Sequence, residues 1–176
     1  MSTSRIDDIV KTALAEVPSA FNSQSNRVIV LHGAQHERLW NITEDILKAK
    51  VPEEKWGRTH AKMAMFKRAA GTILFFVDEE VVEDLQETYK TYADTVPFWA
   101  AQSDGMLQYA LWTLLAGEGI GANLQHYNPL IDEQVERVWN VPKEWKLSGQ
   151  LVFGGITGKP GSKGYMPMED RFKSYA

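Results

Sequence analysis

The chain alternates between stretches with helical spacing of apolar residues and short apolar runs. From about Arg5 to Glu16 the apolar positions recur at helical spacing, which predicts an amphipathic helix that ends before Pro18. Similar patterns predict helices over 34–49, 58–70, 78–92, 96–117 and 132–139. The runs "RVIVLHG", "TILFFV" and "GQLVFGG" predict strands, and "TILFFV" is apolar on both faces, as a buried central strand requires. Helices interleaved with a few strands indicate an α+β or α/β arrangement around one mixed sheet.

The segment after Thr95 carries the longest apolar pattern in the chain. Its apolar residues cover more than one face of the expected helix: Met106, Leu107, Ala110, Leu111, Leu114 and Leu115. Such a helix is typical of a position inside the fold or between subunits. The last segment, "ITGKPGSKGYMPMEDRF", has no periodicity, so it is either disordered or wrapped over another surface. Its aromatic and methionine side chains favour wrapping.

Composition limits the classes of function. With 176 residues the chain is expected to form one domain, 1–176, or one subunit that shares its core with a second copy. A net charge of −4 without runs of like charge gives no reason to expect a nucleic-acid partner. No cysteine, secretory signal or apolar run of about 18 residues is present, so we expect a cytoplasmic protein without a membrane partner.

The loop "PSAFNSQSNR", from Pro18 to Arg27, is unusually rich in amide and hydroxyl groups. A helix-to-strand connection usually needs about two to six residues. One interpretation is a capped connection in which Ser19 and Asn22 satisfy the ends of neighbouring elements. However, two or three caps suffice for one connection, and seven polar residues occur here: Ser19, Asn22, Ser23, Gln24, Ser25, Asn26 and Arg27. Amide side chains donate and accept hydrogen bonds at once, as recognition of a heterocycle or a ribityl chain requires.

Two further segments concentrate polar groups, "NLQHYNP" and "EDRF". The first could be only a strand end with an Asn-Pro turn, and a lone His126 is more often structural than catalytic. Arg171 is either a solvated charge or a phosphate clamp, because a guanidinium fits phosphate oxygens. The histidines show no metal-ligand spacing, and no serine-nucleophile elbow or Walker loop occurs. An enzyme without obvious catalytic side chains can depend on a cofactor.

The segments "PSAFNSQSNRVIVL", "GTILFF", "YADTVPFW", "GANLQHYNPLID" and "GQLVFG" and the terminal "DRF" together resemble the FMN-dependent nitroreductases. The resemblance is to the short-chain branch with Phe-Asn-Ser-Gln in its loop, and it covers nearly the whole chain in order. It implies an α+β nitroreductase-like fold, with a central mixed sheet flanked by helices. It also implies a homodimer with two FMN sites at the interface, each built from both subunits.

The resemblance assigns roles to residues of the polar loop. Pro18, Ser19, Ala20 and Asn22 match the positions where the loop meets the flavin. The amides of Asn22 and Gln24 match groups near the ring and the ribityl chain.

Further along the chain, Gln125 and His126 match the strand that passes the isoalloxazine ring, where a backbone N–H faces flavin N5. Arg171 matches a C-terminal arginine that reaches the FMN phosphate. No metal is implied.

The implied activity is ping-pong electron transfer from NAD(P)H through FMN to a nitroaromatic or a quinone. Phe98, Trp99 and Tyr127 are candidates for apolar walls of the site. Relatives usually begin with an arm that carries Arg-Arg-Ser/Thr and grips the phosphate, whereas this sequence begins at what matches the following helix. The alternative is therefore a non-catalytic dimer that binds flavin or another small ligand and has lost turnover with its arm.

Overall fold

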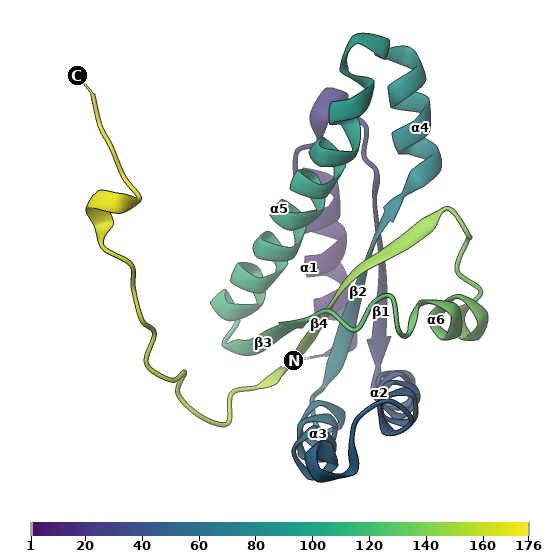
Figure 1. Ribbon diagram of the computed structural model, residues 1–176, viewed down its shortest axis with the longest axis vertical. Coiled ribbons are helices and arrows are strands. Elements are labelled where there is room, and N and C mark those ends of the chain that lie inside the picture. Colours follow the sequence, from purple (N-terminus) through teal and green to yellow (C-terminus); the bar gives the residue numbers. More distant parts are fainter. Residues whose placement is uncertain (1, 176) are drawn as a thin grey trace.

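The computed structural model describes residues 2–175 and contains one four-stranded sheet with helices on both faces (Figure 1). The α-helices are α1 (Thr3–Glu16), α2 (Gly33–Lys48), α3 (Glu53–Lys67), α4 (Glu79–Thr88), α5 (Val96–Gly117) and α6 (Asp132–Trp139). The strands are β1 (Asn26–His32), β2 (Gly71–Asp78), β3 (Ile120–Gln125) and β4 (Trp145–Gly155). Short 3-10 turns are η1 (Ala20–Asn22), η2 (Lys90–Thr95) and η3 (Met168–Asp170).

The sheet has the order β1-β2-β4-β3, and every pairing within residues 2–175 is antiparallel. The expectation of a mixed sheet is therefore wrong. The α2–α3 hairpin returns the chain to the end of the sheet that it left, so that His32 at the end of β1 pairs with Gly71 at the start of β2. A parallel pair would need a crossover that carries the chain back along the whole strand.

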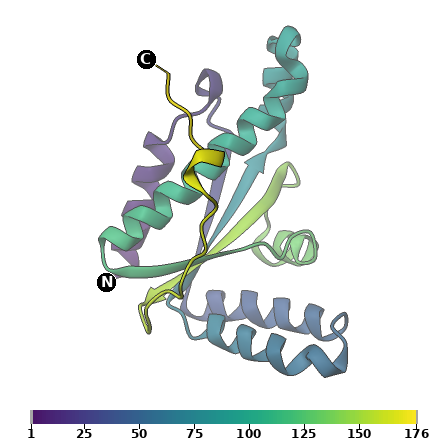
Figure 2. The same cartoon turned by 60° about the vertical axis from the view of Figure 1, so that its left-hand side comes forward.

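The helices form two layers that cover opposite faces of the sheet (Figure 2). One core lies between the sheet and α1 and α5, and it includes Ile9, Phe75, Leu111 and Phe153. The other core lies between the sheet and α2, α3 and α6, where Trp40 is fully buried. Strand β2 has neighbours on both sides and its run "TILFF" is buried on both faces, as the sequence predicts for a central strand.

Three element boundaries differ from those expected by four or five residues, and one of them is the end of α4, at Thr88 instead of Tyr92. Helix α3 begins at Glu53, five residues before the predicted Arg58. Pro52 precedes it, and two glutamates in the first turn offset the positive end of the helix dipole. Strand β4 begins at Trp145, four residues before the predicted start at Gly149, and the predicted helix Asp132 to Trp139 has the observed bounds. Among the described helices, none is long and apolar enough to cross a membrane.

A chain of hydrogen bonds crosses the core between α2, α3 and β2. His36 Nε2 lies 3.0 Å from the Phe66 carbonyl oxygen, so this nitrogen carries the proton and donates. The Thr72 hydroxyl then donates to His36 Nδ1 at 2.8 Å, and Trp40 Nε1 donates to Thr72 Oγ1 at 3.0 Å. Burial lowers the pKa of His36, which matches its neutral form in this chain of bonds.

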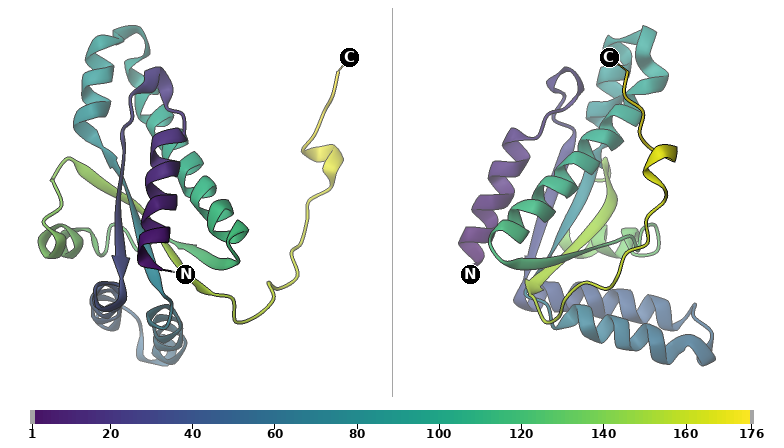
Figure 3. Two further views of the ribbon diagram at one scale, coloured as in Figure 1. Left: turned by 180° about the vertical axis from the view of Figure 1, so that it is seen from behind. Right: turned by 90° about the vertical axis from the view of Figure 1, so that its left-hand side faces the viewer.

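Helix α5 buries one face and leaves apolar side chains on the other. Leu107, Leu111 and Leu115 are fully buried, whereas Tyr109 and Trp112 are exposed. This confirms the prediction that apolar residues cover more than one face of the helix. Beyond β4 the chain runs as an extended tail away from both layers, with its aromatic and methionine side chains exposed (Figures 1 and 3). The tail therefore does not wrap over its own domain.

Candidate functional site

The polar loop joins α1 to β1 through the turn η1, and its backbone is unusual. Phe21, Asn22 and Gln24 have φ angles of 54°, 55° and 52°, in the left-handed region that residues other than glycine seldom adopt. Left-handed backbone outside glycine costs free energy and persists only where surrounding contacts enforce it. Such positions cluster at ligand sites, so this loop is a candidate ligand-binding site.

Hydrogen bonds hold the loop in this shape from within. The Ser19 hydroxyl accepts from the Gln24 backbone N–H at 2.9 Å, and the guanidinium of Arg27 donates to the Gln24 carbonyl oxygen at 2.6 Å. Arg27 also pairs with Asp78 on β2 at 2.8 Å. The expected capping role is not observed for Ser19, because its hydroxyl makes no capping hydrogen bond to η1 and instead accepts from Gln24 within the loop. The side chains of Asn22 and Gln24 remain exposed at the outside of the loop.

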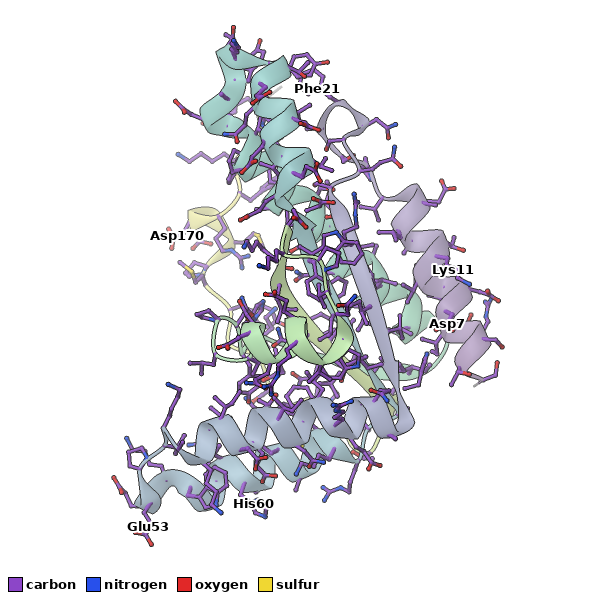
Figure 4. All side chains as sticks on the ribbon, turned by 90° about the vertical axis from the view of Figure 1, so that its right-hand side faces the viewer. Asp7, Lys11, Phe21, Glu53, His60 and Asp170 are labelled. Atoms are coloured by element: carbon purple, nitrogen blue, oxygen red, sulfur yellow. The ribbon has the colours of Figure 1, made fainter. Side chains whose placement is uncertain are left out.

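Aromatic side chains fix the tip of the loop. The Phe21 ring stacks on Tyr89 with centroids 4.0 Å apart, and it lies 5.8 Å from Trp99. Figure 4 shows Phe21 beside the helices at this end of the molecule, far from His60 on α3. Aromatic stacking of this kind stabilises by about 0.5–1.5 kcal/mol. The loop backbone that carries the amide side chains of Asn22 and Gln24 is therefore fixed by the packing of Phe21.

The inner side of the loop is joined to α5 by buried polar groups. Asn26 Nδ2 donates to Ser103 Oγ at 2.9 Å, and the Ser103 hydroxyl donates to the Pro18 carbonyl oxygen at 3.1 Å. Ser25 Oγ and Asn26 Oδ1 are buried without a hydrogen-bond partner. Buried polar atoms are rarely left unpaired, so these two are candidates to meet a ligand or an ordered water.

The second predicted segment follows the end of β3. Gln125 is half-buried and its amide donates to the Leu124 carbonyl oxygen at 2.9 Å, while His126 is exposed. The buried Gln150 side chain supports the next turn, because it accepts from the Tyr127 N–H at 2.7 Å and donates to Asn128 at 3.3 Å. Hydrogen bonds from Gln150 on β4 thus fix the backbone that follows Gln125 and His126.

Helix α5 carries a buried carboxyl group, that of Asp104. Asp104 is 5 % exposed, and its Oδ2 accepts from the Gln108 amide at 2.7 Å. Burial is the largest influence and raises the pKa of Asp104, while the Ser148 hydroxyl, the Gln108 amide and the charge of His126 act in the opposite direction. Ser148 Oγ and Asp104 Oδ1 are both buried without a hydrogen-bond partner, so the hydroxyl acts on the carboxyl group as a nearby dipole.

The structure places most predicted residues in two separate groups. One group is the loop that contacts Ser103 on α5, with Pro18, Ser19, Ala20, Asn22 and Gln24. The other group is Gln125 and His126, at the end of β3. In the single chain a narrow crevice beside the loop, with no room for a ligand, is lined by Ala20, Ser23 and Ser25 with residues of α4 and α5, and not by residues of the second group.

Arg171 lies apart from both groups. It is exposed in the extended tail, directly after η3. Figure 3 shows that this tail runs away from the loop and from β3. Within one chain, Arg171 is therefore not part of the site.

Sequence reasoning missed the polar residues on the buried face of α5. Ser103, Asp104 and Gln108 occur in the stretch "AQSDGMLQ" within an otherwise apolar helix. This break in the apolar pattern is the feature of the sequence from which buried polar residues could have been predicted. Ser148 gave no signal, because it becomes the extra residue of a bulge where β4 pairs with β2. Among residues 2–175 no group of three potential metal ligands is found.

Comparison with known proteins agrees with this architecture. The family model described as "Nitroreductase family" matches residues 1–155. A relative named putative nitroreductase HBN1, from Saccharomyces cerevisiae, is 35% identical over 161 residues, which cover 92% of this chain and 79% of that protein.

Solved structures show the same similarity. Nitroreductase CinD from Lactococcus lactis, in complex with chloramphenicol, superimposes with a TM-score of 0.91 at 45% identity, covering 100% of this chain and 90% of CinD. The same enzyme is known in complex with 4-nitrophenol, with a TM-score of 0.90. A nitroreductase with bound FMN from Desulfitobacterium hafniense shares the fold, with a TM-score of 0.69 at 16% identity over 100% of this chain and 89% of that one. The α+β nitroreductase-like fold is thereby confirmed, and this chain belongs to the nitroreductase family of oxidoreductases.

Proposed function

We propose that the protein is a single-domain FMN-dependent oxidoreductase that passes electrons from NAD(P)H to nitroaromatic or quinone acceptors in a ping-pong cycle. The observation that carries the proposal is the strained loop Pro18–Gln24, whose backbone is fixed from within while its amide side chains point outward. A rigid row of groups that donate and accept hydrogen bonds suits the carbonyl, ring-nitrogen and hydroxyl groups of a flavin. The membership of the family supports the same cofactor.

When bound, FMN would supply the redox chemistry, namely hydride acceptance and electron transfer to an acceptor. The role of the chain would be to bind and orient the cofactor. Asn22 and Gln24 would hold one edge of the flavin, and the backbone beside Gln125 and His126 would face its reactive side. Arg171 would contribute its guanidinium to the phosphate group.

A homodimer completes this site. The tail that carries Arg171 runs away from the loop of its own chain, and an extended tail can deliver the arginine to a partner. The exposed Tyr109 and Trp112 on α5 offer an apolar surface for the second copy. Strand β3 pairs with β4 on one side only, so its other edge is also open for association.

Aromatic side chains provide the acceptor site. Phe98 is 62 % exposed at the start of α5, and Trp99 is half-buried beside Phe21. Tyr127 does not join them, because its ring packs edge-on against Trp40, with centroids 5.7 Å apart, in the core beneath α2 and α3. Flat aromatic walls suit a flat acceptor ring. The complexes of CinD with chloramphenicol and 4-nitrophenol support aromatic nitro compounds as the acceptor class.

The visible spectrum of the purified protein tests the proposed function. We expect flavin absorbance before or after FMN is supplied, anaerobic bleaching by NADH or NADPH, and recovery of the colour when a nitroaromatic or a quinone is added. A protein that binds FMN but is not bleached by either nucleotide would instead be the non-catalytic binding dimer. A protein that takes up no flavin would contradict the proposed cofactor.

Asn22→Ala is expected to weaken FMN binding by about two- to tenfold, since a lost hydrogen bond to a ligand costs about 0.5–1.5 kcal/mol. The matched control is Asn41→Ala, because Asn41 is also exposed but lies on α2 away from the loop. Both variants are titrated with FMN, and the quenching of flavin fluorescence gives the Kd. Equal affinity in the two variants would remove Asn22 from the site.

A further inference from the structure

A cavity lies between α6 and the start of β4, and none of the residues that line it is assigned to the flavin. Its volume is about 120 Å³, comparable with an engineered cavity of about 150 Å³ that binds benzene. The floor is apolar, because Phe76, Val135 and Leu147 are buried in the core that α6 shares with α2 and α3. The cavity therefore has the size and the floor for one small ring.

Trp145, the first residue of β4, provides an aromatic wall that is already in place. Its ring lies 6.0 Å from the Phe76 ring, and the guanidinium carbon of Arg27 lies 5.7 Å from the centre of the indole. Arg27 is fixed in turn by its ion pair with Asp78, at 2.8 Å. Because these contacts hold the indole, a flat ligand can stack on it without first ordering a mobile side chain.

The carboxyl group of Asp132 lines the same cavity from the first turn of α6, and its Oδ1 is buried without a hydrogen-bond partner. Burial raises the pKa of Asp132, while the charge of Lys146 acts in the opposite direction. A desolvated carboxyl group without a partner is destabilising, and an O–H or N–H group of a ligand would relieve this. The cavity therefore favours a ligand with a hydrogen-bond donor.

The charges that line the cavity balance. Asp132 and Glu136 lie on α6, whereas Lys143 and Lys146 lie on the segment that leads into β4. The two lysines oppose a cation beside Asp132, and the two carboxyl groups oppose an anion. A neutral ligand meets neither obstacle.

We propose that this cavity binds a small neutral phenol. The hydroxyl group of the ligand donates a hydrogen bond to the Asp132 carboxyl group, and its ring packs between Trp145 and the apolar floor. Hydroquinones belong to the same chemical class. This site goes beyond the proposed function and does not depend on it, because it is built from other residues.

NMR titration with phenol and toluene tests the site. The indole N–H signal of Trp145 is identified by its loss in Trp145→Phe. Phenol should shift this signal in a saturable way, because Trp145 forms a wall of the cavity. Toluene has nearly the same shape without the hydroxyl group, so the ratio of the toluene Kd to the phenol Kd reports the hydrogen bond. A Trp145 signal that does not respond to phenol would overturn the proposal.

Asp132→Ala should lower this ratio by about tenfold, because the bond to the carboxyl group is lost while the difference in hydrophobicity between the two probes remains. Glu133→Ala is the matched control. Glu133 is the exposed neighbour in the first turn of α6, and it does not line the cavity. Both changes remove one negative charge from the same end of the helix. An equal ratio in the two variants would overturn the role of Asp132.

A cavity-filling variant tests where the ring lies. Val141 is buried and borders the cavity, and Val141→Met places a longer, flexible side chain in the space. This change should weaken phenol and toluene alike, whereas undiminished binding of both would show that they bind elsewhere. Benzylamine and benzoate, which carry opposite charges, should each bind more weakly than phenol. Tighter binding of either one would contradict a neutral ligand.

A last comparison separates this site from the flavin site. The phenol Kd at Trp145 should be the same before and after FMN is supplied, since the two sites share no residue. Displacement of phenol by FMN would overturn the separate site and leave the proposed function standing. Protein that binds phenol in this way but takes up no FMN would contradict the proposed function and leave the phenol site standing.

Discussion

Gly71→Ala is expected to destabilise the protein by about 3 kcal/mol, at the upper end of the usual cost of overpacking a core. Gly71 opens the central strand β2, with β1 on one side and β4 on the other. A Cβ at this position would lie 2.3 Å from Cζ of Phe153 and 2.8 Å from the Leu31 carbonyl oxygen. The Phe153 ring is 2 % exposed and closely packed, and the Leu31 oxygen belongs to the backbone of a paired strand. Neither neighbour can move without disturbing the sheet.

The effect of Gly71→Ala is measured by urea denaturation at a fixed protein concentration, because a dimer makes the apparent stability depend on concentration. Gly57→Ala is the matched control. Gly57 lies exposed in α3, and nothing lies within 4 Å of the position a Cβ would take. This change should stabilise by about 0.5–1 kcal/mol, since alanine is the better helix former. Equal midpoints for the two variants would show that the strand tolerates the methyl group.

Thr72→Val is expected to destabilise by about 2–5 kcal/mol, although the two side chains have nearly the same shape. The Thr72 hydroxyl donates to His36 and accepts from the Trp40 indole, and all three side chains are fully buried. Valine leaves a buried indole N–H and a buried imidazole nitrogen without partners. Each unsatisfied buried group costs about 1–3 kcal/mol.

Two further variants separate the hydroxyl group from the methyl group in this experiment. Thr72→Ser keeps the hydroxyl and should lose much less stability than Thr72→Val. Thr59→Val is the control on α3, where the hydroxyl lies 3.5 Å from the Lys55 carbonyl oxygen at the surface, and it should change the stability by less than about 0.5 kcal/mol. If Thr72→Ser and Thr72→Val unfold at the same urea concentration, the hydrogen-bond chain does not contribute as argued.

Much of the secondary structure could be predicted because it depends on local patterns. The continuous apolar run after Gly71 requires a strand buried on both faces, and the structure confirms it as β2. The helix from Asp132 to Trp139 has the predicted bounds, because the acidic first turn and the left-handed Asn140 after its last residue mark its two ends. The start of α3 was placed too late, since its first turn is polar and gives no apolar periodicity.

The candidate site was only partly accessible from the sequence. The loop from Pro18 to Gln24 could be identified by its composition, because a high local density of amide and hydroxyl groups is evident in the sequence itself. The left-handed backbone at Phe21 has no such signature, since it is enforced by stacking on Tyr89, far along the chain. The burial of the Asp104 side chain was equally hidden, because it depends on how α5 packs against the sheet.

By itself the sequence determined the order of the six helices and of three of the four strands, the polar loop, and the resemblance that family membership confirms. The tertiary structure alone decided the directions of the strands, the burial of Asp104 and the separation of Arg171 from the loop. The physical reason is the range of the forces involved. Periodicity and turn chemistry act between residues a few positions apart, whereas strand direction and the burial of a carboxyl group depend on which distant segments pack together.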